Sequence, residues 1–112
     1  MIQTIGIVGA GQMGNGIAHV LAVAGFNVLL TDASSTQINK ALPAIEKNLN
    51  RQVSRDRLDH AKALDALSRI QTVTDLPELA EVNMVVEAAT EDEDIKREIL
   101  TELGLSKRYE MF

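Results

Sequence analysis

The stretch Ile5–Ala18, IGIVGAGQMGNGIA, decides the fold because it joins an apolar run to a cluster of glycines. Residues Thr4–Val8 are apolar and β-branched, which is typical of a strand buried on both faces of a parallel sheet. Glycines then follow at Gly9, Gly11 and Gly14, the spacing G-x-G-x-x-G. They permit a tight turn, close approach of a pyrophosphate to the backbone, and close helix–strand packing. The stretch therefore predicts a strand, a turn and a helix whose first amides face a phosphate group.

Beyond the turn, the apolar residues change to helical spacing. They recur at i, i+3, i+4 and i+7, and this pattern predicts the buried face of a helix, made of Ile17, Val20, Leu21 and Ala24. Gly25 then occupies the position that follows a helix C-cap, and Phe26–Leu30 predicts a second strand.

An acidic residue, Asp32, follows this second strand, 18 residues beyond Gly14. A carboxylate at about this distance accepts hydrogen bonds from the ribose hydroxyls of an adenosine, and its charge repels a 2′-phosphate. No arginine follows in TDASST, residues 31–36. The carboxylate and the lack of an arginine thus favour NAD over NADP as the cofactor, and the strand–turn–helix–strand context supports a dinucleotide site. The alternative is a glycine-rich turn without a ligand and an Asp that only opens a loop.

A helical arm is expected between the second and third strands. Ser34 or Ser35 can cap its first helix, and an amphipathic stripe follows, made of Ile38, Leu42, Ile45, Leu49 and Val53. Pro43 lies inside this stripe and removes one backbone hydrogen bond. We expect a kink between Asn39 and Pro43, or a helix that restarts at Pro43.

The second helix of the arm is expected from about His60 to Arg69, with Asp59 as its N-cap. Its inward residues are predicted as Ala61, Leu64 and Leu67. Basic residues gather around the bend of the arm, at Lys47, Arg51, Arg55 and Arg57. They fit a solvated helix face; the functional alternative is contact with a phosphate-bearing substrate.

The rest of the chain predicts two more strands, at Ile70–Val73 and Met84–Ala88, separated by a short turn or helix capped by Asp75. Thr90 and Glu93 form a capping box for a further helix that ends near Gly104. This order predicts an α/β Rossmann-type open parallel sheet with strand order 3-2-1-4 and helices on both faces. The ligand is expected at the carboxyl ends of strands one and four, where Glu87, Ala88, Ala89 and Glu91 fall.

Size and composition limit the function classes. A length of 112 residues suits one domain, 1–112. The absence of cysteine excludes disulfides and Cys-ligated metals, so we expect no metal and a cytoplasmic location. The N-terminus lacks the basic region of a signal peptide, and no apolar run is long enough to span a membrane. A net charge of −5 argues against nucleic acid as a partner.

Three segments together resemble the nucleotide-binding domain of the 3-hydroxyacyl-CoA dehydrogenases, in particular the short-chain, 3-hydroxybutyryl-CoA branch. They are IGIVGAGQMGNGIAHVLAVAGFNVLLTD, the helical arm, and TDLPELAEVNMVVEAATEDEDIKREIL. The resemblance covers about residues 2–103. It implies the oxidation of 3-hydroxyacyl-CoA to 3-ketoacyl-CoA with NAD, in fatty-acid metabolism, with an acyl-CoA as the substrate partner.

The resemblance also implies roles for particular residues. Residues 9–16 match the pyrophosphate turn, including Gly9, Gly11, Gln12, Met13 and Gly14. Asp32 matches the ribose acid, and Ala88, Glu91 and Lys96 fall at positions near the cofactor. In the arm, Asn48 and Arg55 match positions that contact CoA in some relatives.

The family pattern continues with N-T-S-S, then H-F-F-N-P with a catalytic histidine, then a glutamate and an all-helical domain, none of which these residues contain. The chain is therefore truncated relative to the family, and no catalytic residue is assigned. His19 is expected to face solvent or a neighbouring helix, and His60 lies in the arm, so neither is a base. We expect these residues alone to be inactive.

The tail LSKRYEMF, residues 105–112, does not resemble the family's continuation. Strand Met84–Ala88 is therefore expected to be an edge strand, and its apolar edge predicts a homo-oligomer, formed there or through exposed apolar helix faces.

Two other functions stay open. One is a catalytically incomplete nucleotide-binding module. The other is an oxidoreductase of the 3-hydroxyacid dehydrogenase type, which also begins with G-x-G-x-M-G; the helical arm and the pair Asp32–Ala33 disfavour it.

Overall fold

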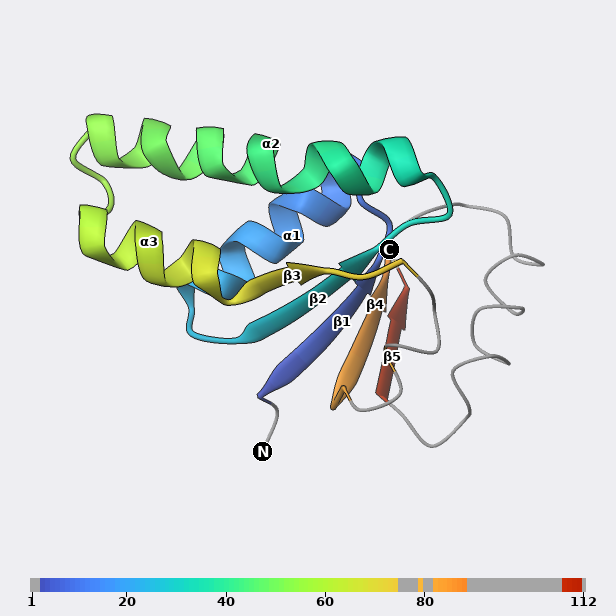
Figure 1. Cartoon of the computed structure of the whole chain (residues 1–112). Helices are drawn as coiled ribbons and strands as arrows, with labels where there is room; N and C mark the ends of the chain where they lie inside the picture. The colour runs from blue at the N-terminus through green and yellow to red at the C-terminus, as the bar shows by residue number, and fades with distance from the viewer. Residues whose placement is uncertain (1–2, 75–78, 80–81, 89–107, 112) are drawn as a thin grey trace.

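The computed structural model describes residues 3–74, 79, 82–88 and 108–111. It contains a parallel sheet with strand order β3-β2-β1-β4-β5 (Figure 1). The strands are β1 Thr4–Val8, β2 Asn27–Thr31, β3 Ile70–Thr72, β4 Met84–Glu87 and β5 Arg108–Met111. The predicted α/β class and the order 3-2-1-4 are confirmed, with strand boundaries that differ from the predicted ones by a single residue.

The fifth strand corrects one expectation. β5 pairs with β4 in parallel, from Met84 opposite Arg108 to Glu87 opposite Met111. β4 is therefore an inner strand, and the prediction that it forms an apolar edge is wrong. The tail escaped recognition because a four-residue strand leaves little periodicity in a sequence, and its pairing uses backbone groups that every residue carries. The predicted self-association through the edge of β4 is therefore no longer supported.

The sheet is buried on both faces, as the apolar composition of its strands predicts. Because successive side chains alternate across a strand, Ile5 and Ile7 of β1 join one core cluster with Val28 and Leu30 of β2. Val8 joins a second cluster on the opposite face, whose other buried members are Val73, Leu79, Val82 and Val85. Three helices cover the first face (Figure 1).

Helix α1, Gln12–Val23, follows the glycine turn and ends before Gly25, which has φ 106° as expected for a residue that closes a helix. Its buried residues are the small ones, Gly14, Ala18 and Ala22. Ile17 and Leu21 pack against the core only partly. The predicted inward positions Val20 and Ala24 are wrong, because both are exposed.

The physical reason is the short distance between α1 and the turn. A Cβ atom added to Gly14 would overlap the carbonyl oxygen of Gly9. The helix axis therefore lies so close to β1 that small residues fill the contact, and the larger apolar side chains turn outward.

Helix α2, Ser35–Ser54, begins as predicted at the N-cap Ser34, whose Oγ accepts a hydrogen bond of 3.4 Å from the amide of Gln37. Its predicted stripe is confirmed, with Ile38, Ile45 and Leu49 buried and Leu42 and Val53 packed against the core. The helix continues through Pro43, so a restart at that residue is wrong. The proline is on the exposed side, where water can bind the carbonyl that loses its partner; the kink stays a prediction.

Helix α3, His60–Ser68, runs antiparallel to α2, and the two form the arm that packs on α1 (Figure 1). Asp59 occupies the predicted N-cap position, although its side chain makes no capping bond. The buried residues are Ala63 and Ala66, so the prediction of Ala61 and Leu64 is wrong. The predicted Leu67 does pack against the core. Small residues again make the contact, because α3 lies near both α1 and α2.

The start of the chain is attached to a residue far along the sequence. The Oδ1 atom of Asn83, just before β4, accepts hydrogen bonds from the amides of Gln3 and Thr4, at 3.0 and 2.9 Å. The backbone amide of Asn83 donates to the Thr4 carbonyl at 2.9 Å.

Some predictions fall outside the described residues: the turn at Asp75, the helix from Thr90 to Gly104, and the site candidates Ala89, Glu91 and Lys96. Within the described part, no helix combines the length and the hydropathy needed to cross a membrane.

Candidate functional site at the glycine turn

The glycine turn lies at the point where the strand order of the sheet reverses. β1 is followed in sequence by β2 and β3 on one side, while β4 and β5 lie on the other. In such sheets, ligands bind outside the carboxyl ends of the strands at this reversal. β1 ends here at Val8 and β4 ends at Glu87, which is fully buried; the amide of Ala88 donates to the Val8 carbonyl at 2.8 Å.

The turn itself is fixed by backbone hydrogen bonds. Gly9 has φ 123°, a conformation that favours glycine. Its amide donates to the carbonyl of Thr31 at 2.7 Å, and the amide of Ala10 donates to Oδ2 of Asp32 at 2.8 Å. The turn is thus attached to the end of β2.

The next three amides remain available at the start of α1. The first helical hydrogen bond near this end runs from the Asn15 amide to the Gly11 carbonyl, at 2.9 Å, and no side chain caps the helix. The N–H groups of Gln12, Met13 and Gly14 therefore have no acceptor within the helix, and the helix dipole adds partial positive charge there.

Gly11 leaves the space before these amides open. A Cβ atom at Gly11 would meet no described atom within 4 Å, so the absent side chain is not required by the packing of the described residues. In the G-x-G-x-x-G pattern, the second glycine lets the backbone approach a pyrophosphate closely. The donor set and this opening fit a diphosphate.

Asp32 lies beside this opening. Its Oδ1 accepts from the amide of Ser34 and its Oδ2 from that of Ala10, both at 2.8 Å. The side chain is half-buried. Each carboxylate oxygen still has a lone pair free after one hydrogen bond, so the group can also accept from sugar hydroxyls.

The structure brings most of the predicted cofactor residues to this one edge, namely Gly9, Gly11, Gln12, Met13, Gly14, Asp32 and Ala88. Sequence reasoning missed the contributions of Thr31 and Ala10, whose backbone groups tie the turn to β2. No sequence signal marks them, because backbone groups are common to all residues. It also missed Asn15, whose Oδ1 is buried and has no hydrogen-bond partner among the described residues.

A second candidate region lies between α1 and the arm; we call it the arm pocket. It has a volume of about 370 Å³ and is lined by Gly16, His19, Val20, Asn48, Arg51, Gln52, Arg55 and Arg57. Asn48 and Arg51 share one face of α2 through their i, i+3 spacing, and Arg55 is the C-cap residue of the same helix. The predicted CoA residues Asn48 and Arg55 thus line one pocket with two further arginines.

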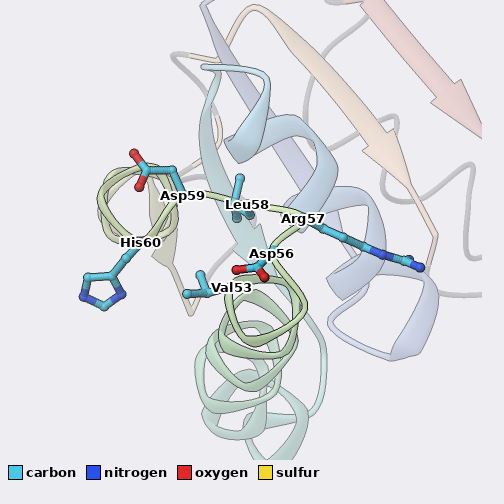
Figure 2. A pocket seen from close by; sticks show the side chains of 6 residues that line it. All are labelled: Val53, Asp56, Arg57, Leu58, Asp59 and His60. Atoms are coloured by element: carbon cyan, nitrogen blue, oxygen red, sulfur yellow. The ribbon is translucent and has the colours of Figure 1, made fainter.

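The two histidines lie where they were expected. Nε2 of His19 is 2.9 Å from Oε1 of Gln52 on α2, so this side chain faces a neighbouring helix. His60 lines a separate hollow of about 380 Å³ at the α2–α3 turn, with Asp56 and Asp59 (Figure 2). These three side chains point in different directions in Figure 2, and the described residues contain no group of three or more side chains suited to a metal ion.

Comparisons with known proteins agree with this geometry. Residues 4–109 match the family model described as the NAD binding domain of 3-hydroxyacyl-CoA dehydrogenase. A 3-hydroxybutyryl-CoA dehydrogenase of Bradyrhizobium diazoefficiens is 46% identical over 103 residues, which are 92% of this chain and 35% of the relative. A 3-hydroxyadipyl-CoA dehydrogenase of Escherichia coli is 37% identical, over 92% of this chain and 22% of the relative.

A solved structure shows the same arrangement. The crystal structure of the (S)-3-hydroxybutyryl-CoA dehydrogenase from Ralstonia eutropha superposes with a TM-score of 0.91 at 37% identity, covering 99% of this chain and 41% of that one. The chain thus spans about a third of the length of the curated 3-hydroxybutyryl-CoA dehydrogenase that it matches. Given the family match, the strand order and the glycine turn, the chain belongs to the 3-hydroxyacyl-CoA dehydrogenase family and carries its NAD-binding domain.

Proposed function

We propose that this chain is the NAD-binding part of an enzyme that transfers hydride between NAD and the 3-hydroxy carbon of a 3-hydroxyacyl-CoA, such as 3-hydroxybutyryl-CoA. The observation that carries the proposal is the open glycine turn, with three helix amides free of acceptors beside the carboxylate of Asp32. When bound, NAD supplies the hydride acceptor, and the residues of this chain position it.

Each part of the site has one task in this proposal. The amides of Gln12, Met13 and Gly14 bind the diphosphate. Gly9 permits the turn, and Gly11 keeps a side chain out of the way of the diphosphate. Asp32 accepts hydrogen bonds from the adenosine ribose. Ala88 lies at the end of β4, beside the turn, and the family resemblance adds Glu91 and Lys96.

The CoA moiety is proposed to bind at the arm pocket. Three arginine side chains line it together with Asn48, and guanidinium groups suit the phosphates of a nucleotide. This favours the functional interpretation of the basic cluster over a merely solvated helix face. Lys47 does not line the pocket, so the proposal concerns Arg51, Arg55 and Arg57.

We further propose that these 112 residues bind NAD without turnover. Reduction of a ketone requires a proton donor near the reacting carbon. His19 is held by Gln52 in the arm pocket, and His60 lies at the far end of the arm, so neither is placed beside the glycine turn. The alternative function is therefore a nucleotide-binding module that performs no chemistry of its own.

One pair of measurements tests both functions. Calorimetric titration of the chain with NAD is expected to show one site, while NADH oxidation with acetoacetyl-CoA is expected to show no turnover. Absence of NAD binding would refute the site. Turnover would show that these residues contain a base, and the module would be rejected.

The cellular location and the oligomeric state are proposed from other observations. The absence of cysteine supports the reducing cytoplasm. Of the two surfaces predicted for a homo-oligomer, the exposed apolar helix faces remain, since β5 covers the edge of β4.

A further inference from the structure

His19 is the one residue of the arm pocket lining whose charge can change near neutral pH. It comes from α1, and the opposite side of the pocket is formed by α2 and the turn that follows it. Nε2 of the ring is 2.9 Å from Oε1 of Gln52, in a partly buried contact. The second ring nitrogen, Nδ1, has no hydrogen-bond partner among the residues that the structure describes.

The partner of Nε2 determines which ring nitrogen carries a hydrogen. The oxygen of an amide side chain can only accept, so Nε2 donates to Gln52. A neutral imidazole has a hydrogen on one nitrogen only, which leaves Nδ1 as an acceptor. A phosphate oxygen that carries no proton is also only an acceptor. His19 can therefore donate from Nδ1 to such an oxygen only when the ring gains a second proton and becomes a cation.

The charged groups that line the pocket with His19 are all guanidinium groups. They belong to Arg51 in the last turn of α2, Arg55 at its C-cap and Arg57 in the following turn. Among the described lining residues there is no acidic side chain, and α1 contributes no other charged group. A bound anion would be the negative charge that favours a proton on the ring, because a nearby opposite charge stabilises the charged form.

We propose that His19 is a further phosphate-binding residue of the arm pocket and that it acts as an imidazolium, so that binding of the nucleotide takes up a proton. This inference rests on the proposed function, because it takes the arm pocket as the site of the CoA phosphates. The proton moves from the solvent to Nδ1, which then donates to a phosphate oxygen, and no covalent bond to the ligand forms. Since the ordinary charge change of histidine falls between about pH 5 and 8, the affinity for the nucleotide depends on pH in this range.

The experiment counts the protons taken up when adenosine 3′,5′-bisphosphate, which represents the nucleotide end of CoA, binds to the 112-residue chain. Calorimetric titrations at about pH 7, in two buffers with different ionisation enthalpies, give this number. His19→Gln is the test variant, because its amide can still donate to Gln52 but cannot become a cation. We expect the unmodified chain to take up about half a proton more than His19→Gln. The phosphates of the probe also titrate, near about pH 6, and the comparison between the two chains cancels their contribution.

The pH dependence of the affinity gives a second readout. An imidazolium loses its proton as the pH rises from about 5.5 to 8. The ratio of the affinity of the unmodified chain to that of His19→Gln is therefore expected to fall about tenfold over this range, which equals about 1.4 kcal/mol. His60→Gln is the matched control, since His60 is the other histidine of the sequence and lines the separate hollow at the α2–α3 turn (Figure 2). It should leave both readouts unchanged.

A third measurement keeps His19 itself in place. In the His60→Gln chain, His19 supplies the one imidazole signal in a proton NMR spectrum. Addition of the bisphosphate at about pH 7 should move this signal toward the position of an imidazolium. Thermal unfolding checks that both variants fold, and the NMR titration decides the question if His19→Gln does not.

The outcomes separate this inference from the proposed function. If the bisphosphate binds and Arg55→Ala weakens it, but the unmodified chain and His19→Gln take up equal numbers of protons, the arm pocket stands and the role of His19 is overturned. A ring signal that stays at its neutral position in the saturated chain overturns this role as well. If the bisphosphate binds at no pH in this range, the arm pocket and the role of His19 are both overturned, while NAD binding still tests the glycine turn.

Discussion

In the proposed function, Asp32 combines two tasks in one side chain. Its oxygens already accept the amides of Ala10 and Ser34, which holds the carboxylate at the glycine turn before any cofactor arrives. Such preorganisation lowers the ordering cost of binding. It also means that substitution of Asp32 would affect the turn as well as the proposed ribose contact.

Asp32→Ala is expected to weaken NAD binding by about ten- to a hundredfold, since a hydrogen bond to a charged group contributes about 1.5–3 kcal/mol. It should also reduce discrimination against NADP, because the charge that repels a 2′-phosphate is gone. Calorimetric titration with both cofactors measures this. Asp32→Asn is the control: it keeps an acceptor for one amide, so NADP discrimination should fall more than NAD affinity. Equal binding of NAD and NADP by the unmodified chain would contradict the role.

Gly14 and Gly11 form a matched pair of glycines. Gly14→Ala places a Cβ on the carbonyl oxygen of Gly9, so we expect destabilisation by about 1–3 kcal/mol or more. Gly11→Ala meets open space, so its stability should be nearly unchanged while NAD binding weakens. Urea unfolding and calorimetry separate the two effects. Equal stability loss in both variants would show that the turn geometry has been misassigned.

The glycine spacing allowed the turn to be predicted, because at each of these positions a side chain would be sterically unfavourable. The buried face of α1 was not predictable in the same way. The helical spacing of large apolar residues predicted that Val20 is buried. In the structure, α1 lies so close to β1 that only the small residues Gly14, Ala18 and Ala22 are buried.

Pro43 is an unusual residue in an uninterrupted helix. It removes a hydrogen bond from the middle of α2, yet the helix runs from Ser35 to Ser54. The buried stripe of α2, with Ile45 and Leu49 almost fully covered, compensates for that loss through tertiary packing.

Pro43→Ala is therefore expected to raise the free energy of unfolding by up to about 3 kcal/mol, because it restores a backbone donor at an exposed position. Denaturant unfolding gives the value, and Lys47→Ala, another exposed position on α2, should change it by no more than about 0.5 kcal/mol. A loss of stability in Pro43→Ala would mean that the proline ring makes contacts that favour the folded arm.

The arginines of the arm pocket lead to a prediction about the binding of nucleotide phosphates. Arg55→Ala is expected to weaken binding of adenosine 3′,5′-bisphosphate to the arm pocket about tenfold, in line with a lost hydrogen bond to a charged group, and to leave NAD binding unchanged. Lys47→Ala removes a neighbouring charge from α2 outside the pocket lining and serves as the control. Similar weakening by both substitutions would indicate diffuse electrostatic attraction.

Helix existence and order were predictable in this arm, and the capping residues Ser34 and Asp59 were correctly placed. Of the inward residues predicted for α3, Leu67 packs against the core. Ala61 and Leu64 do not, because α3 packs against two helices at once and small side chains make that contact. The meeting of Gly16, His19 and Asn48 in one pocket depends on how α1 and α2 cross, which no local pattern encodes.

At the scale of the molecule, β5 is the feature that changes the expected behaviour. Strand pairing along β4 covers backbone groups that would otherwise form an open edge. Removal of residues 108–112 should uncover them and promote association between chains. Sedimentation velocity over a concentration series measures this: the shortened chain is expected to self-associate more strongly than the intact one. Identical profiles would show that β5 contributes nothing to protection of the edge.

The sheet order followed from the alternation of strands and helices and from the right-handed crossover rule. The position of β5 did not, because a short segment paired through its backbone resembles any irregular tail in sequence.

The bonds between Asn83 and the first residues of β1 have a consequence for synthesis on the ribosome. β1 is translated before the other described strands, yet it pairs with β4. The amides of Gln3 and Thr4 donate to an acceptor that is made 80 and 79 positions later. A nascent chain shorter than this cannot complete its central strand. Pairing of β1 with β4 is thus postponed until about three-quarters of these residues have been translated. The sheet therefore forms late during synthesis and does not grow steadily with the chain.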